Sequence, residues 1–348
     1  MATQSDVNNF FGSTVIGHPS GLFVLFFTEM WERFSYYGMR AILVLFLTTS
    51  LLEGGWGWPS EEALALYGTY TSLVYVTPII GGWIADKHIG YRAAVVIGAV
   101  IMTLGHASLA VETNWSLYLG LFLLVAGNGF FKPNMTSIIS QMYEKKPEKQ
   151  DGAFTIFYMG VNAGAFLGIL LCGYVGEMIS WSWGFGLAGI FMFFGMLQFY
   201  FAQGIFGSVG KNPKKAKQQE LAAAEDKVGD VFSEKEEDDE AHLTKEERKR
   251  NPFTKLDIVL TAISAIIGIV WVINDPISKI GGVNLFNFHI LDMAGSTVAI
   301  LFALLLFFIM LISRLARYRG ILRDKMIAVA IFAFFTVFFW AAFEQAGG

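Results

Sequence analysis

The sequence predicts an all-α polytopic membrane protein, and three observations support this fold class. First, 54% of the 348 residues are hydrophobic, and the mean hydropathy is +0.51, far from the usage of a soluble globular domain. Second, nine apolar segments are each long enough to cross a hydrocarbon core of roughly 30 Å. Third, charge is concentrated in one polar segment, 211–250, which holds 10 of the 25 basic and 12 of the 29 acidic residues. The sequence therefore predicts six spans, a linker and three further spans.

The predicted spans follow one another with short connections in each half of the chain. The first apolar segment is expected to be retained as a span, because the residues before it lack a signal-peptide pattern. The lone Cys172 lies in an apolar run, where it is expected to be a buried, inert thiol. The nine spans are predicted at 21–48, 63–85, 91–111, 115–141, 152–177, 183–206, 255–275, 288–313 and 326–346.

Basic residues in the connections predict the orientation of the chain. Lys and Arg occur between spans 2 and 3, between spans 4 and 5, in the polar segment and between spans 8 and 9. The connections at 49–61, 112–114 and 178–182 contain neither. We therefore expect the N-terminus and all the basic connections to be cytoplasmic.

The polar segment 211–250 is rich in Lys, Glu, Asp and Ala and has few residues that could form a core. We expect a solvated linker with a helical stretch around 218–227, although a partner-binding role stays open. In span 5, Gly160, Gly164 and Gly168 recur at four-residue spacing, which predicts close packing on a neighbouring helix.

The first span carries an unusual group of charges. Glu29, Arg33, Tyr36, Tyr37 and Arg40 fall on one stripe of a helix, with Glu32 at its border. Charges near the centre of a span cost roughly 2.5 to 3.5 kcal/mol each, so these side chains should face protein or water. Glu29 and Arg33 can pair, and protonation of the glutamate would release the arginine to bind an anion. A permanent ion pair that holds helices together is the alternative.

A second intramembrane cation, Lys132, lies in span 4 just before Pro133, which should kink the helix. Such a lysine needs a carboxylate, and Glu29 or Glu32 are the candidates because spans 1 and 4 are equivalent in two three-helix repeats. Alternatively, Lys132 reaches the cytoplasmic surface at the end of the helix.

Other polar residues complete the candidate set. Asp86, Lys87 and Arg92, where spans 2 and 3 connect, could bridge helix ends as a gating latch or serve only structure. Asn162 in span 5 could hydrogen-bond a neighbouring helix or a polar solute. Glu344, the one ionisable group in the interior of the last span, is a second candidate for protonation.

Several functional classes lack their motifs in this sequence. We find no phosphate loop of an ATP-driven pump, no HExxH, no Cys/His cluster and no basic–aromatic pattern for nucleic acid. No nucleophile–base set typical of an intramembrane enzyme occurs in the spans. We therefore expect no catalytic residues, no metal and no cofactor.

Four ordered motifs resemble those of the proton-coupled oligopeptide transporter family of the major facilitator superfamily. Glu29–Gly38 matches ExxERFxYYG, and Gly81–Arg92 matches the motif that connects helices 2 and 3. Gly127–Asn134 matches GxGxxKPN, and Phe154–Gly164 resembles FxxFYxxxNxG. The resemblance covers essentially the whole chain.

The resemblance implies symport of di- and tripeptides with protons, driven by the proton gradient, through alternating access of two six-helix bundles. The expected partners are peptides, protons and the lipid bilayer of a bacterial inner membrane, with no nucleic acid and no obligate protein partner. The implied proton-coupling residues are Glu29, Glu32, Arg33, Lys132 and Glu344. The implied peptide-binding residues are Arg33, Tyr36, Tyr37, Arg40, Tyr75, Lys132 and Asn162.

The resemblance also implies a division of the chain into a six-helix bundle (1–206), a cytoplasmic linker (207–253), an extra helix pair of the bacterial type (254–320) and the first helix of the C-terminal bundle (321–348). Five further core helices would follow, so residues 1–348 alone are not expected to transport. A proton-coupled carrier of nitrate or another small anion is the alternative within transport, and a non-transporting receptor is the alternative outside it.

Overall fold

The structure, a computed structural model, describes residues 14–211, 253–318 and 320–345. It divides into two compact units, Met1–Asp230 and Val231–Gly348. The expected helix around 218–227 lies outside the described residues.

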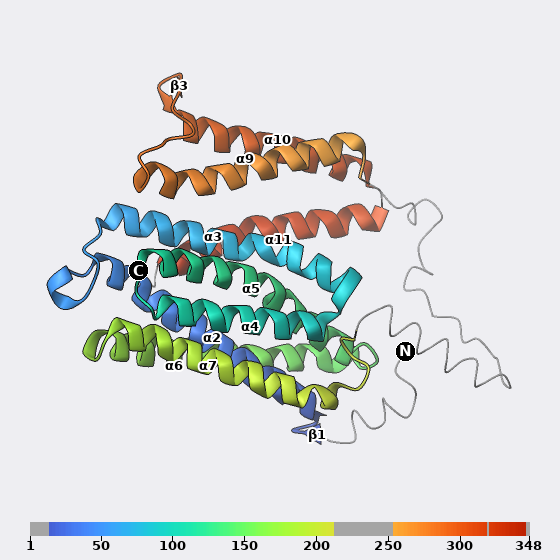
Figure 1. Cartoon of the computed structure of the whole chain (residues 1–348). Helices are drawn as coiled ribbons and strands as arrows, with labels where there is room; N and C mark the ends of the chain where they lie inside the picture. The colour runs from blue at the N-terminus through green and yellow to red at the C-terminus, as the bar shows by residue number, and fades with distance from the viewer. Residues whose placement is uncertain (1–13, 212–252, 319, 346–348) are drawn as a thin grey trace. The chain divides into compact units, whose positions relative to one another are not determined.

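Six long helices build the first unit, and Figure 1 shows them in blue to yellow-green. They are α2 (Ser20–Thr48), α3 (Ser60–Ile84), α4 (Tyr91–Leu109), α5 (Asn114–Met142), α6 (Gln150–Met178) and α7 (Trp181–Ala202). Short elements precede or connect them: β1 (Thr14–Val15), β2 (His18–Pro19), η1 (Leu51–Glu53), the π-helical turn η2 (Ala85–Ile89), η3 (Pro147–Lys149) and η4 (Gln203–Phe206).

Local sequence sets the ends of several of these helices. Thr113 and Ser116 form a reciprocal capping box at the start of α5, and Ser180 caps α7 by accepting a hydrogen bond from the backbone N–H of Trp183. The α4–α5 connection is short, and Glu112 within it adopts a positive φ of 56°. These caps satisfy backbone donors that would otherwise be unpaired at the membrane surface.

The helices pack in two related groups. α2 packs mainly on α6 and α7, whereas α5 packs mainly on α3 and α4, and α4 also contacts α7. Exchanging the first three helices with the last three maps these pairs onto one another. This pattern agrees with the expectation that α2 and α5 are equivalent in two three-helix repeats.

Glycines allow α6 to lie directly on the backbone of α2. A Cβ at Gly160, Gly164 or Gly168 would press on the carbonyl oxygens of Phe26, Met30 and Phe34, respectively. Both sets recur every four residues, so one face of α6 follows one face of α2. The predicted close packing at these glycines is confirmed, and Cys172, one turn further, is buried and free.

The second unit contains α9 (Lys255–Lys279), α10 (Gly295–Arg317) and α11 (Gly320–Gln345), with a hairpin of β3 (His289–Ile290) and β4 (Met293–Ala294) before α10. α9 and α10 pack together, and a buried carboxylate, Asp257, joins them. Arg317 Nη2 lies 2.6 and 2.7 Å from the two oxygens of Asp257, and Arg314 Nη1 lies 3.3 Å from Oδ2. The helix pair is thus held by its own charged cluster.

Nine helices of the described chain correspond to the nine predicted spans. Seven of them are long and apolar enough to cross a membrane; α2 and α11 are not among the seven. α2 carries four charged residues in its interior, which lowers its hydropathy. Two predicted starts were wrong: the span at 288–313 begins at Gly295, after the β3–β4 hairpin, and the last helix begins at Gly320 rather than at 326.

Candidate functional site

The centre of the candidate site is one turn of α2 in which three ionisable side chains are buried. Glu29, Glu32 and Arg33 are 4%, 0% and 5% exposed. The Nε atom of Arg33 lies 3.0 Å from Glu29 Oε1 and 2.5 Å from Glu32 Oε2. The glycines of α6 place a second helix against this turn, since a Cβ at Gly164 would also lie 3.0 Å from the Cβ of Arg33.

The two carboxylates therefore meet on the same nitrogen of one guanidinium. If both are ionised, the three side chains carry one negative charge in excess. Glu29 Oε2, both carboxylate oxygens of Glu32, and Arg33 Nε and Nη2 are buried and make no hydrogen bond among the described residues, although the charges lie within ion-pair distance. Because unpaired buried charge is costly, this arrangement favours either a proton on one carboxylate or an additional cation nearby.

The pairing of Glu29 with Arg33, predicted from their four-residue spacing, is confirmed. Glu32, expected at the border of the stripe, is instead fully buried and closer to Arg33. Adjacent helical positions do not face each other, but the long arginine side chain lies where both carboxylates reach it.

Lys132 of α5 does not make the ion pair that was expected for it. Its Nζ lies 4.6 Å from the centre of the Tyr75 ring of α3, a cation–π distance, and no described carboxylate lies within ion-pair distance. Both candidate glutamates are already engaged by Arg33. Lys132 is half-buried, and its positive charge acts on both Glu29 and Glu32.

Tyrosines connect the two arginines of α2. The Tyr36 ring lies between them, with its centre 5.2 Å from Cζ of Arg33 and 5.4 Å from Cζ of Arg40. Tyr37 and Tyr67 also approach Arg40, at 5.7 and 5.4 Å. The stripe predicted on the first span is thus a continuous row of charges and phenol rings.

The remaining predicted peptide-binding residues are more open. Tyr75 is 55% exposed, and Asn162 on α6 is exposed. Glu344 lies in the last turn of α11, and its side chain is outside the described part of the structure.

Two residues absent from the predicted set now stand out. Tyr67 hydrogen-bonds Arg40, and Asn128 of α5 is 1% exposed with no hydrogen-bond partner for either amide atom among the described residues. Asn128 lies one turn before Lys132, on the same side of α5. The position of Asn128 inside the GxGxxKPN match was the one feature of the sequence that could have identified it. Nothing in the sequence indicates that Tyr67 contacts Arg40.

The residues proposed as a latch divide into two kinds. Asp86 and Lys87 are exposed in the turn η2, where Lys87 lies over the ring of Trp83. Arg92 is buried at the start of α4 and donates hydrogen bonds to the carbonyl oxygens of Gln203 (3.1 Å) and Gly207 (2.8 Å), beyond α7. This placement favours a structural role for Arg92.

Arg92→Ala is therefore expected to lower the free energy of unfolding by about 3 kcal/mol, because it removes two hydrogen bonds from a charged donor. Thermal unfolding of the purified protein in detergent measures this effect, with Lys87→Ala as the exposed control. If Arg92→Ala melts like the wild type but transports abnormally, Arg92 acts as a latch instead.

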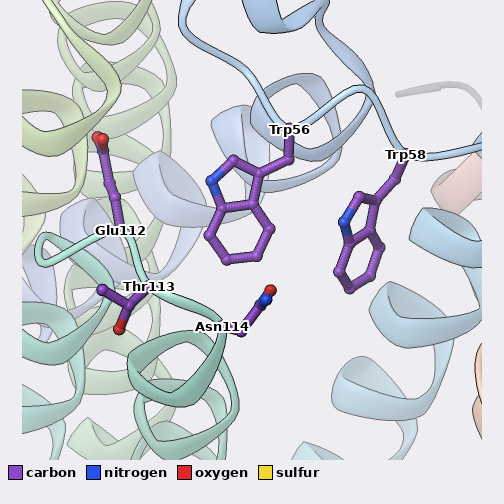
Figure 2. A pocket seen from close by; sticks show the side chains of 5 residues that line it. All are labelled: Trp56, Trp58, Glu112, Thr113 and Asn114. Atoms are coloured by element: carbon purple, nitrogen blue, oxygen red, sulfur yellow. The ribbon is translucent and has the colours of Figure 1, made fainter.

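A cavity of about 400 Å³ lies elsewhere in the first unit, among the connections after α2 and α4 (Figure 2). Trp56 and Trp58 line it with ring centres 5.8 Å apart, and the Asn114 side chain points toward the space between them. Glu112 points away from the indoles, and partial burial raises the pKa of its carboxyl. None of the predicted site residues lines this cavity.

Comparison with known proteins identifies a family and similar transporters. The profile of the POT family matches residues 92–281. A "Di-/tripeptide transporter" of Lactococcus lactis subsp. cremoris is 40% identical over 58% of this chain and 41% of its own length, and "Uncharacterized transporter YclF" of Bacillus subtilis (strain 168) is 42% identical over 58% of this chain and 42% of its own length. The matched part of the chain thus covers well under half the length of these relatives.

Solved structures show the same relationship. A crystal structure of a "peptide transporter POT in complex with sulfate" is 33% identical with a TM-score of 0.59, covering 78% of this chain and 55% of that one. A mutant form in complex with alafosfalin is 31% identical with a TM-score of 0.58, covering 89% of this chain and 70% of that one. Because the POT family model matches more than half of the chain, this multi-pass membrane chain belongs to the POT family, the proton-coupled oligopeptide transporters.

Proposed function

We propose that the protein imports di- and tripeptides together with protons by alternating access across a bacterial inner membrane. One observation carries the proton coupling: Glu29 and Glu32 meet on the same nitrogen of the buried Arg33. The peptide substrate is supported by relatives described as di-/tripeptide transporters. The proton gradient alone drives transport, without a cofactor or an obligate protein partner.

The proposed coupling is an exchange of partners at Arg33. Protonation of Glu29 or Glu32 removes one negative charge, weakens that carboxylate's hold on Arg33, and leaves the guanidinium able to attract the carboxylate of a peptide. Lys132 adds a second positive charge beside the cluster. When the peptide leaves and the proton is released, both glutamates pair with Arg33 again.

In this proposal the peptide lies along the row of tyrosines on α2 and the open faces of α3 and α6. Arg33, Arg40 and Lys132 favour its carboxylate end. Tyr36, Tyr37, Tyr75 and Asn162 contact its backbone and side chains. Glu344 is a second protonation site.

The orientation follows from charge. The connections after α2 (49–59), α4 (110–113) and α6 (179–180) contain no Lys or Arg. The connection after α3 contains Lys87, and the connection after α5 contains Lys145, Lys146 and Lys149. The N-terminus is then cytoplasmic. Asp86 and Lys87 in η2 would face the cytoplasm, where they could latch the closed state.

Uptake of labelled dialanine into proteoliposomes tests the proposal, using the full-length protein with and without an inward proton gradient. We expect accumulation only with the gradient, and competition by tripeptides but not by nitrate. Competition by nitrate alone would instead favour the anion carrier, and gradient-independent uptake would contradict proton coupling.

A further inference from the structure

The guanidinium of Arg40 is enclosed by aromatic rings from two helices. The ring centres of Tyr36 and Tyr37 on α2 and of Tyr67 on α3 all lie within 5.4 to 5.7 Å of its Cζ. Each distance permits a cation–π interaction. Such an enclosure limits where the planar guanidinium can lie.

A hydrogen bond between helices orients the guanidinium within this enclosure. Arg40 Nε donates to the hydroxyl oxygen of Tyr67 at 2.7 Å. Nε is the donor closest to the flexible stem, so holding it sets the plane and direction of the two terminal nitrogens. An arginine whose fork is oriented in advance loses less conformational entropy when it binds a carboxylate.

The hydrogen bond between Arg40 and Tyr67 also joins α2 to α3, two helices that pack mainly on different neighbours. α2 packs mainly on α6 and α7, and α3 mainly on α5. Arg40 and Tyr67 are both half-buried, so their contact lies at an accessible edge rather than in the core. Tyr67 therefore contributes little to core packing, and its main effect is to orient the Arg40 guanidinium.

We infer that Tyr67 is a positioning residue, which holds the Arg40 guanidinium toward the carboxylate of the bound peptide. This inference rests on the proposed function, because it assigns Arg40 to the carboxylate end of a peptide. Tyr67 itself acts through Arg40 and need not touch the substrate.

The variant Tyr67→Phe removes only the hydroxyl and keeps the ring. In the full-length protein we expect the KM for dialanine to rise about 10-fold, as for loss of a hydrogen bond to a charged group, while kcat stays within about twofold. Alanylalaninamide, which has no carboxylate, should be transported with an unchanged KM. Tyr174→Phe, which alters an exposed tyrosine on α6, serves as the matched control.

A double-mutant cycle separates positioning from general damage. Lysine has no donor at the place of Nε, so Tyr67→Phe should add little to Arg40→Lys. An equal rise in KM for both peptides, additive effects in the cycle, or an unchanged KM for dialanine would overturn the inference and leave the transport function intact. Failure of the wild type to take up dialanine would overturn both.

Discussion

Replacing Glu32 with glutamine is expected to abolish proton-driven accumulation of dialanine while leaving counterflow of the peptide partly intact. Glutamine has the shape of a protonated glutamate but cannot release a proton. Glu32 is fully buried, and its carboxylate lies 2.5 Å from Arg33 Nε. The variant therefore holds the cluster in its proton-loaded charge state, in which peptide can still bind and exchange.

The size of the effect follows from the driving force. A pH difference of one unit is worth a factor of about 10 in accumulation for each coupled proton. With Glu32→Gln, the ratio of internal to external peptide should fall to about 1 under the same gradient. Proteoliposomes loaded with unlabelled peptide measure counterflow in the absence of a gradient.

Glu29→Gln is expected to act in the same direction, because Glu29 shares the Nε atom of Arg33. Glu177→Gln is the matched control, since this carboxylate is exposed near the end of α6. Undiminished acid-driven accumulation in both site variants would show that the cluster is a permanent staple between helices. Loss in one variant alone would identify which carboxylate carries the proton.

The sequence predicted most of the fold because membrane spans leave a strong signal. Each of the first six helices begins and ends within a few residues of its predicted bounds. The eighth predicted span began too early, because Phe288, Ile290 and Met293 extend the apolar run into a segment that forms a β-hairpin. There Leu291 and Asp292 take positive φ values of 50° and 61°, a turn that hydropathy cannot reveal.

Within the site, contacts along one helix were predictable and contacts between helices were not. The spacing of Glu29 and Arg33 fixed their pairing, since i and i+4 lie on one face. The sequence showed that Lys132 carries a charge within a span, but not how far it lies from the carboxylates of another helix. In the structure Lys132 contacts the Tyr75 ring rather than a carboxylate. The bond between Arg40 and Tyr67 likewise depends on how α2 and α3 meet.

Gly164→Ala is expected to destabilise the first unit strongly. A Cβ at this position would overlap the carbonyl oxygen of Met30 and lie 3.0 Å from the Cβ of Arg33. The neighbour is backbone, so it cannot rotate away, and α2 also packs on α7. Separating α6 from α2 should cost about 1 to 3 kcal/mol in the free energy of unfolding.

Gly173→Ala on the same helix provides the control, because a Cβ there meets no atom within 4 Å. Alanine favours a helix over glycine by roughly 0.5 to 1 kcal/mol, so this variant should melt at or slightly above the wild-type temperature. Thermal unfolding in detergent compares the two. Equal stability of the variants would contradict the direct contact of α6 with the backbone of α2.

The same substitution should also disturb transport beyond its effect on stability. Gly164 presses on the turn of α2 that carries Arg33, so a displaced α6 moves the guanidinium relative to Glu29 and Glu32. In the fraction of protein that remains folded, dialanine accumulation under a proton gradient should fall, whereas gradient-free counterflow should fall less. A folded Gly164→Ala protein with wild-type accumulation would show that the Glu–Arg cluster keeps its geometry without this helix contact.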